Sequence, residues 1–281
     1  MGSTFGRWQV DFVSAGSFAL DGGAMFGIVP KPLWEKKIPA DDKNRILLDT
    51  RCMLLRDGER VVLVDCGMGS QWNDKERDIY RIDGHLDAAL AAVGVTPSQV
   101  TDLVLTHLHF DHAGDVARLN AQGAATLTFG NARVHIGRRA WEHAHAPNER
   151  DRGSFRAQCW APLDGVERGR VVLIEDHEGR ATILPELEAL VCEGHTTGQL
   201  LPLAGARDQR ALYGADMVPT RAHVPVPWHM GYDLRPIVVM EEKRRLVELC
   251  AAEGITLVHE HDRVFPTSSI VRGPKGELQA A

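Results

Sequence analysis

Short, mostly apolar runs recur along the chain and predict the strands of a buried sheet. Runs of this length that lack a polar alternation are typical of strands covered on both faces. The runs are Val61–Cys66, Leu103–Leu105, Arg133–Ile136, Val171–Ile174, Leu190–Cys192, Ala211–Tyr213 and Thr256–Val258.

Helical patterns separate these runs. The spacing of Leu86, Leu90 and Val93 predicts one helix face, and Gly94 is suited to cap that helix. A longer helix is predicted over 236–253, between a proline and a glycine. Strands that alternate with helices indicate an α/β protein whose sheets are covered by helices.

Two segments show neither the apolar runs of strands nor the spacing of a helix. Residues 14–45 are rich in glycine and aromatic side chains and are interrupted by proline, which predicts a long ordered apolar loop. Residues 217–235 form a second, proline-rich loop. The sequence shows no internal repeat and no linker, so we expect a single domain over 1–281.

Composition narrows the class of protein. The 281 residues are 44% hydrophobic and 25% charged, and the net charge of −6 argues against a nucleic-acid partner. The sequence contains no run of 18 apolar residues, so no membrane span is predicted. The N-terminus lacks the pattern of a secretory signal. The five cysteines are scattered, which suits a reducing compartment. We therefore expect a cytoplasmic protein whose partner is a small molecule, and the composition leaves a homodimer open.

Residues 106–115 contain the most specific chemical signal in the chain. They place three imidazoles and a carboxylate in six positions, as His107-x-His109-x-Asp111-His112. Such ligands suit a borderline divalent metal such as zinc. His107 and His109 lie two positions apart at the end of a strand and should point to the same side. The motif therefore predicts a metal site.

Further donors are expected where other strands end. His195, Asp216 and either His259 or His261 each follow an apolar strand and begin a loop. Asp65 lies in an analogous place after the run that begins at Val61. Strand ends are the usual position of sites in α/β sheets.

These five motifs, spread over about 61–262, resemble the metallo-β-lactamase superfamily. The resemblance implies an αββα sandwich with the metals at one edge of the two sheets. It also implies that one metal is held by His107, His109 and His195, that a second is held by Asp111, His112 and His261, and that Asp216 bridges both. Asp65 would orient a ligand histidine. His261 is preferred to His259 because a strand followed by His-Asp is the pattern of related lactonases.

The implied reaction is hydrolysis with two divalent metal ions per chain, zinc being the best match. A hydroxide shared by the ions would attack the substrate, and Asp111 would relay a proton to the leaving oxygen. A serine nucleophile is not supported, since no G-x-S-x-G motif is present.

Segments 22–30 and 219–233 are similar to a group that contains quorum-quenching N-acyl-homoserine lactonases and methyl parathion hydrolase. Their apolar content suggests a substrate pocket for an N-acyl-homoserine-type lactone or ester. Familiar lactonases carry a tyrosine shortly after the bridging aspartate, whereas Met-Val-Pro follows Asp216 here, so Tyr232 or His223 would have to replace it. The candidate substrate-binding residues are Met25, Phe26, His223, Trp228 and Tyr232.

Three alternatives accompany this interpretation. An organophosphate triesterase would use the same metal pair on a phosphoryl group. A mononuclear iron dioxygenase would have a reduced second site, and a non-catalytic metal-binding scaffold would usually have lost ligands.

Overall fold

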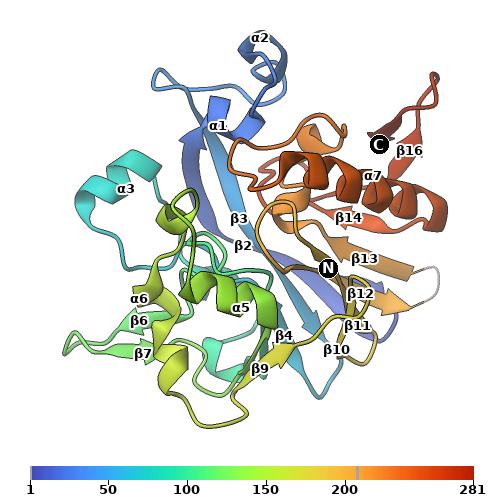
Figure 1. Cartoon of the computed structure of the whole chain (residues 1–281). Helices are drawn as coiled ribbons and strands as arrows, with labels where there is room; N and C mark the ends of the chain where they lie inside the picture. Colours follow the sequence, from blue (N-terminus) through green and yellow to red (C-terminus); the bar gives the residue numbers. More distant parts are fainter. Residues whose placement is uncertain (1, 207–208) are drawn as a thin grey trace.

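Two large β-sheets form the centre of the fold, and helices lie on either side of them (Figure 1). The computed structural model describes residues 2–206 and 209–281. The first sheet has the strand order β1-β2-β3-β4-β5-β8-β9, with β4, β5, β8 and β9 mutually parallel. Its strands are β1 (Ser3–Phe5), β2 (Trp8–Asp21), β3 (Arg45–Arg56), β4 (Val61–Val64), β5 (Asp102–Leu105), β8 (Arg133–Gly137) and β9 (Val171–Ile174).

The second sheet has the order β10-β11-β12-β13-β14-β15, with β13 and β14 parallel. Its strands are β10 (Arg180–Leu184), β11 (Leu187–Cys192), β12 (Gln199–Ala206), β13 (Gln209–Tyr213), β14 (Thr256–Val258) and β15 (Thr267–Ser268). Two small hairpins lie outside both sheets: β6 (Ala117–Leu119) with β7 (Ala125–Leu127), and β16 (Ile270–Arg272) with β17 (Leu278–Ala280).

The helices vary from one turn to five. They are α1 (Gly22–Phe26), α2 (Lys31–Trp34), α3 (Asp74–Tyr80), α4 (Leu86–Ala92), α5 (Arg138–His145), α6 (Ala157–Trp160) and α7 (Pro236–Glu253). Single 3₁₀ turns cover Pro97–Gln99, Arg152–Ser154, Ala161–Gly165, Ala215–Met217 and Arg221–His223. Both predicted helices are confirmed, and Gly254 ends α7 in the left-handed conformation, with φ 63°.

Alternation along β3 shows how the layers form. Met53 and Leu55 pack into the cluster shared with the second sheet and α7, whereas Cys52 and Leu54 face the cluster that contains residues of α4, α5 and α6. Both faces of the strand are therefore buried, which is why neighbouring strands of the sheet appear in the sequence as continuous apolar runs. The fold is the predicted αββα sandwich.

The prediction of a loop over 14–45 is wrong in most of its length. Residues up to Asp21 continue β2, and α1 and α2 follow. The strand was hidden because its pairing with β3 shifts between Ser14 and Ser17, where Gly16 has φ 140°. This irregularity breaks the two-residue period by which a strand is recognised.

The ends of strands from both sheets converge at one edge. Asp65 follows β4, His107 follows β5, His195 follows β11, Asp216 follows β13 and His261 follows β14. Within the described ranges, no helix is long and apolar enough to cross a membrane.

Candidate metal centre

The first group of donors combines three histidines and a carboxylate. One ligand atom each from His107, His109, His195 and Asp216 lies within 4.8 Å of the others, and all four residues are buried. The Oδ2 atom of Asp216 lies 3.0 Å from His195 Nε2 and 3.9 Å from His107 Nε2. Three imidazoles and one oxygen so placed can form a four-coordinate zinc site.

A second group lies directly beside it and consists of Asp111, His112 and His261. The Oδ2 atom of Asp111 lies 3.8 Å from His112 Nε2 and 3.6 Å from His261 Nε2. Asp216 stands between the groups, because its Oδ1 atom lies 3.0 Å from His261 Nε2, while Oδ2 lies 3.0 Å from His195 Nε2 and 3.5 Å from His112 Nε2. Its two oxygens can therefore serve one cation each.

The unpaired atoms of the site show that a cation fits. Buried polar atoms normally have a hydrogen-bond partner. Here four atoms that face the two groups have none among the described residues: Nε2 of His107, His112 and His261, and Oδ1 of Asp216. Leaving so many buried polar atoms unpaired would be costly without a ligand. The donor set suits a divalent metal that prefers nitrogen and oxygen ligands.

In three of the donor histidines, the ring nitrogen that faces away from the donor groups is fixed by a hydrogen bond. His112 Nδ1 donates to Asp65 Oδ2 at 2.9 Å, and His195 Nδ1 donates to Asp233 Oδ1 at 2.9 Å. His261 Nδ1 donates to the main-chain oxygen of residue 49 at 2.8 Å. These bonds fix the ring and the tautomer, so that Nε2 presents a lone pair to a metal. Asp65 has the orienting position that was predicted for it.

Charges around the site favour positive charge within it. Burial opposes the protonation of His195, but Asp216 and Asp233 outweigh that effect and raise its pKa to about 10. Burial is likewise outweighed at His261, where Glu260, Asp216 and Asp111 raise the pKa to about 9. Burial and neighbouring imidazoles lower the pKa of His107 and His109 well below the usual range, so those rings stay neutral.

The sequence matches the family described as Metallo-beta-lactamase superfamily over residues 45–254, about three quarters of the chain. The chain belongs to the metallo-β-lactamase superfamily. Membership and the buried His/Asp donor set identify it as a metal-dependent hydrolytic enzyme. As expected from the sequence motifs, the family accounts for the sandwich and for the donors at its edge.

Solved structures agree on the fold. A probable metal-dependent hydrolase from Staphylococcus aureus is 25% identical, with a TM-score of 0.87 and coverage of 99% of each chain. AidC, described as a dizinc quorum-quenching lactonase, is 17% identical, with a TM-score of 0.81 over 100% of this chain and 96% of that one.

Curated relatives match over a shorter stretch. The cytochrome P450 monooxygenase mpaDE of Penicillium roqueforti (strain FM164) is 24% identical over 109 residues, which is 34% of this chain and 13% of that protein. The chain thus covers only about an eighth of that relative's length.

Two of the six non-glycine residues with a positive φ in the described part of the chain lie beside the donor groups of this metallo-β-lactamase centre. Asp65 and Ala215, which precedes Asp216, adopt φ values of 56° and 39°. Residues other than glycine rarely occupy this left-handed region, at a cost of about 1–3 kcal/mol. The strain positions two carboxylates at the ends of β4 and β13.

Two carboxylates that contact the centre were not predicted. Asp233 lies in the proline-rich loop, where nothing in the local pattern distinguishes it. Glu260 is fully buried between the two candidate histidines of the 259–262 segment, and its Oε2 atom lies 3.1 Å from His112 Nδ1. Burial raises the pKa of Glu260 to about 7, against the attraction of His112. A glutamate flanked by two histidines is the only sequence signal that could have found it.

The preference for His261 over His259 agrees with the geometry. His259 Nε2 lies 2.8 Å from Ser268 Oγ, and Nδ1 donates to the oxygen of Val218 at 3.2 Å, so both nitrogens are used within the fold. The pKa of His259 falls to about 4, chiefly because it is buried. The two rings have different surroundings although they lie two positions apart, because β14 has already ended at Val258.

A cavity of about 260 Å³ lies over the donor atoms. Its wall includes ligand side chains together with Tyr80, Tyr232, Met25, Met230 and Phe110. Two of the predicted substrate-binding residues, Met25 and Tyr232, therefore line it. Burial raises the pKa of the Tyr232 phenol, so this group is a neutral hydrogen-bond donor.

The remaining predicted substrate residues do not line this cavity. Phe26 is fully buried and stacks on His223, with ring centroids 4.5 Å apart. His223 is itself fully buried, accepts from Thr220 Oγ1 and donates to the oxygen of Met25, each at 2.8 Å. Both are core residues, so the prediction is wrong for them. Trp228 packs edge-on against Phe26 and lines a different groove.

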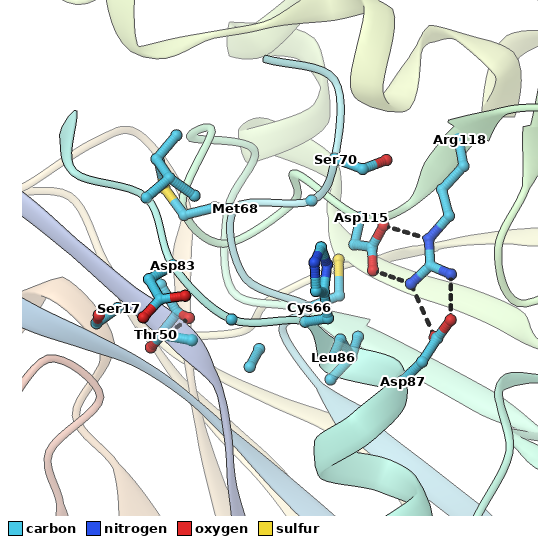
Figure 2. Close-up of a pocket in the computed structure, with 16 residues that line it drawn as sticks. Ser17, Thr50, Cys66, Met68, Ser70, Asp83, Leu86, Asp87, Asp115 and Arg118 are labelled. Carbon is cyan, nitrogen blue, oxygen red and sulfur yellow. Dashed lines mark hydrogen bonds and ion pairs between the residues drawn. The ribbon is translucent and has the colours of Figure 1, made fainter. Parts of the chain in front are cut away.

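A smaller cavity, of about 130 Å³, is lined by residues that flank the metal motifs in sequence (Figure 2). Arg118 bridges Asp115 and Asp87 there, and Cys66 donates through Sγ to the oxygen of His112 at 3.3 Å. Burial raises the pKa of the Cys66 thiol well above its usual value, which makes it a poor nucleophile. These contacts hold in place the loop that carries the His107–His112 motif.

Proposed function

We propose that this chain opens a lactone or ester bond in a small, partly apolar molecule of the N-acyl-homoserine lactone type, using two divalent metal ions that we take to be zinc. One observation carries this proposal. The donor groups and a set of apolar and aromatic side chains line the same cavity. A pocket that joins reacting groups to an apolar wall is the usual form of a small-molecule site.

The count of two ions rests on Asp216. Its carboxylate contacts both donor groups, at 3.0 Å from His195 in the first and at 3.0 and 3.5 Å from His261 and His112 in the second. When bound, divalent ions would activate water at neutral pH and polarise the scissile carbonyl. The family neighbours include a dizinc lactonase, which supports the same assignment.

The chain's own residues supply the remaining roles. Asp111 projects a carboxylate into the cavity, and burial raises its pKa, so it can hold the proton that the leaving oxygen requires. Tyr232 can donate to the carbonyl oxygen in place of the tyrosine that follows the bridging aspartate in familiar lactonases. Met25, Met230 and Phe110 exclude water from the bond that is cleaved.

The cavity volume limits the substrate. About 260 Å³ lies just below the usual range for ligand pockets, roughly 300–1,000 Å³. We therefore expect short-chain substrates to be turned over with a higher kcat/KM than long-chain ones.

The test measures the activity of the zinc-loaded protein on a panel of substrates, together with the number of metal ions bound per chain. Ring opening is followed by proton release for butanoyl-, hexanoyl- and dodecanoyl-homoserine lactone, beside an aryl ester and an aryl phosphotriester. We expect lactone opening that favours the shorter chains, two zinc ions per chain, and loss of activity in Asp216→Asn. Turnover of the phosphotriester alone, or one metal ion per chain, would refute the proposal.

Tyr232→Phe and Tyr80→Phe form a matched pair, because both phenols line the cavity. We expect the first to lower kcat and the second to leave it unchanged. Equal losses would remove Tyr232 from its proposed role.

A further inference from the structure

A second, larger cavity adjoins the metal centre and has no part in the function proposed above. It is a groove of about 720 Å³, and His261 lines both this groove and the cavity over the donor atoms. The rest of its wall comes from residues 37–39, from Leu47, from the 221–228 and 262–265 segments and from β17. We call it the C-terminal groove. Its volume lies within the usual range of ligand pockets, about 300–1,000 Å³.

Exposed and half-buried apolar side chains line the C-terminal groove. Val264 and Phe265 are 72% and 43% exposed, and Trp228 is half-buried and packs edge-on against Phe26. The loop that carries the first two is fixed, because Asp262 Oδ1 accepts from the main-chain nitrogens of Val264 and Phe265 at 2.9 and 2.8 Å. Apolar side chains held in the open within a concavity indicate a binding surface.

The charge of the C-terminal groove opposes that of the chain. Lys37, Arg221 and Arg263 line it, whereas the whole chain has a net charge of −6. Arg221 already has partners within the fold, since it donates to the oxygen of Ala280 at 3.0 Å and its guanidinium lies 4.4 Å from the centroid of the Phe265 ring. The side chains of Lys37 and Arg263 are exposed and have no hydrogen-bond or ion-pair partner in the described part of the chain.

Asp262 offsets only one of the three cations. Among the described lining residues it is the single carboxylate, and its oxygens accept main-chain hydrogen bonds from Arg221, Val264 and Phe265. Two cations therefore remain available beside an apolar wall. That arrangement complements a molecule with an apolar body and one negative charge.

We propose that the C-terminal groove binds a small amphipathic carboxylate. Its apolar chain would lie on Trp228, Val264 and Phe265, and its carboxylate would lie between Lys37 and Arg263. A single negative charge matches two flexible, exposed cations better than a phosphate would, because a phosphate is usually held by several main-chain N–H groups that point at it together. This proposal is independent of the hydrolytic function.

The probe is decanoate, added below its micelle-forming concentration to zinc-loaded protein and followed by titration calorimetry. Decyltrimethylammonium has the same chain and the opposite charge. We expect decanoate to bind one site per chain and the ammonium compound to bind at least tenfold more weakly. Equal binding of the two probes would overturn the proposal.

Variants locate the site. Lys37→Glu/Arg263→Glu should weaken decanoate binding about tenfold, since each exposed ion pair contributes about threefold. The matched control is Lys75→Glu/Arg133→Glu, which changes the net charge equally at exposed positions outside the groove. Val264→Ser should weaken binding, whereas Ile237→Ser, at a residue 67% exposed on α7, should not.

Two further results would each overturn the proposal. If removal of zinc abolishes binding, decanoate occupies the metal centre rather than the C-terminal groove. If Val264→Ser changes the sedimentation coefficient but not decanoate binding, the groove is an interface between two copies of the chain. All the substituted side chains are exposed, so a thermal melt is expected to show intact folding.

Discussion

Lys243 offers a direct test of how the loop over the metal centre is held. Its side chain is 1% exposed on α7, and Nζ donates to the main-chain oxygen of Trp228 at 2.7 Å. Burial lowers the pKa of this ammonium from 10.5 to about 8, against the attraction of Asp233. Lys243→Met keeps a long, unbranched side chain at this position and removes the titrating group.

The sign of the effect follows from which state binds the proton. Below pH 8 Lys243 is protonated in both states, so the folded state bears the full cost of the buried charge. Between pH 8 and 10.5 the unfolded state holds more protons, and the stability of the native protein rises with pH. A pKa fall from 10.5 to about 8 corresponds to about 3 kcal/mol. The free energy of unfolding of Lys243→Met relative to wild type should therefore fall by up to about 3 kcal/mol across this window.

Urea unfolding at pH 7, 8.5 and 10 measures this difference directly, with zinc present at a fixed free concentration. Lys75→Met is the control, because Lys75 is exposed on α3 and its contribution should not change with pH. Parallel stability curves for wild type and Lys243→Met would show that the buried ammonium is not destabilised, and would refute the reasoning.

Three further predictions concern the core and the ligands. Phe26→Ala should lower the free energy of unfolding by about 3–5 kcal/mol, as expected for a fully buried ring, while KM for any substrate stays unchanged; a raised KM at unchanged stability would contradict its core assignment. Asp233→Ala should weaken zinc binding about 10- to 100-fold in chelator competition, because it releases His195 Nδ1, and unchanged affinity would argue against that role. His261→Ala should lower the zinc content by one ion per chain whereas His259→Ala should not, and equal contents would exclude His261 as a ligand.

The strands and the metal donors can be predicted from the sequence, each for a different physical reason. Central strands such as β4 and β5 are buried on both faces, so their apolar runs are visible without any knowledge of their neighbours. β3 and β12 are also largely buried but were not among the predicted strands. The histidines and aspartates of the centre are recognisable because close spacing of such groups has few other uses. β2 escaped prediction because the shift between Ser14 and Ser17 interrupts its period.

The substrate wall was only partly predictable, since an apolar loop residue can be covered by a ligand or by the fold. Met25 and Phe26 are adjacent and of similar character, yet only Met25 lines the cavity. α1 turns Phe26 toward Trp34, with ring centroids 5.3 Å apart. No local pattern distinguishes these two outcomes, because Phe26 is also covered by His223 and Trp228, which lie far away in the sequence.

The carboxylates of the centre show why its full composition had to come from the structure. Five of them are buried within or against the two donor groups: Asp65, Asp111, Asp216, Asp233 and Glu260. Buried charge of one sign is expensive unless it is compensated. These carboxylates outweigh the effect of burial and raise the pKa of His195 and His261, so that in the absence of metal protons on the two rings compensate part of the charge. Metal ions can bind these rings only by displacing those protons, so affinity for metal is tied to pH by the same carboxylates that make the site. Asp233 and Glu260 thus shape the chemistry without belonging to any motif.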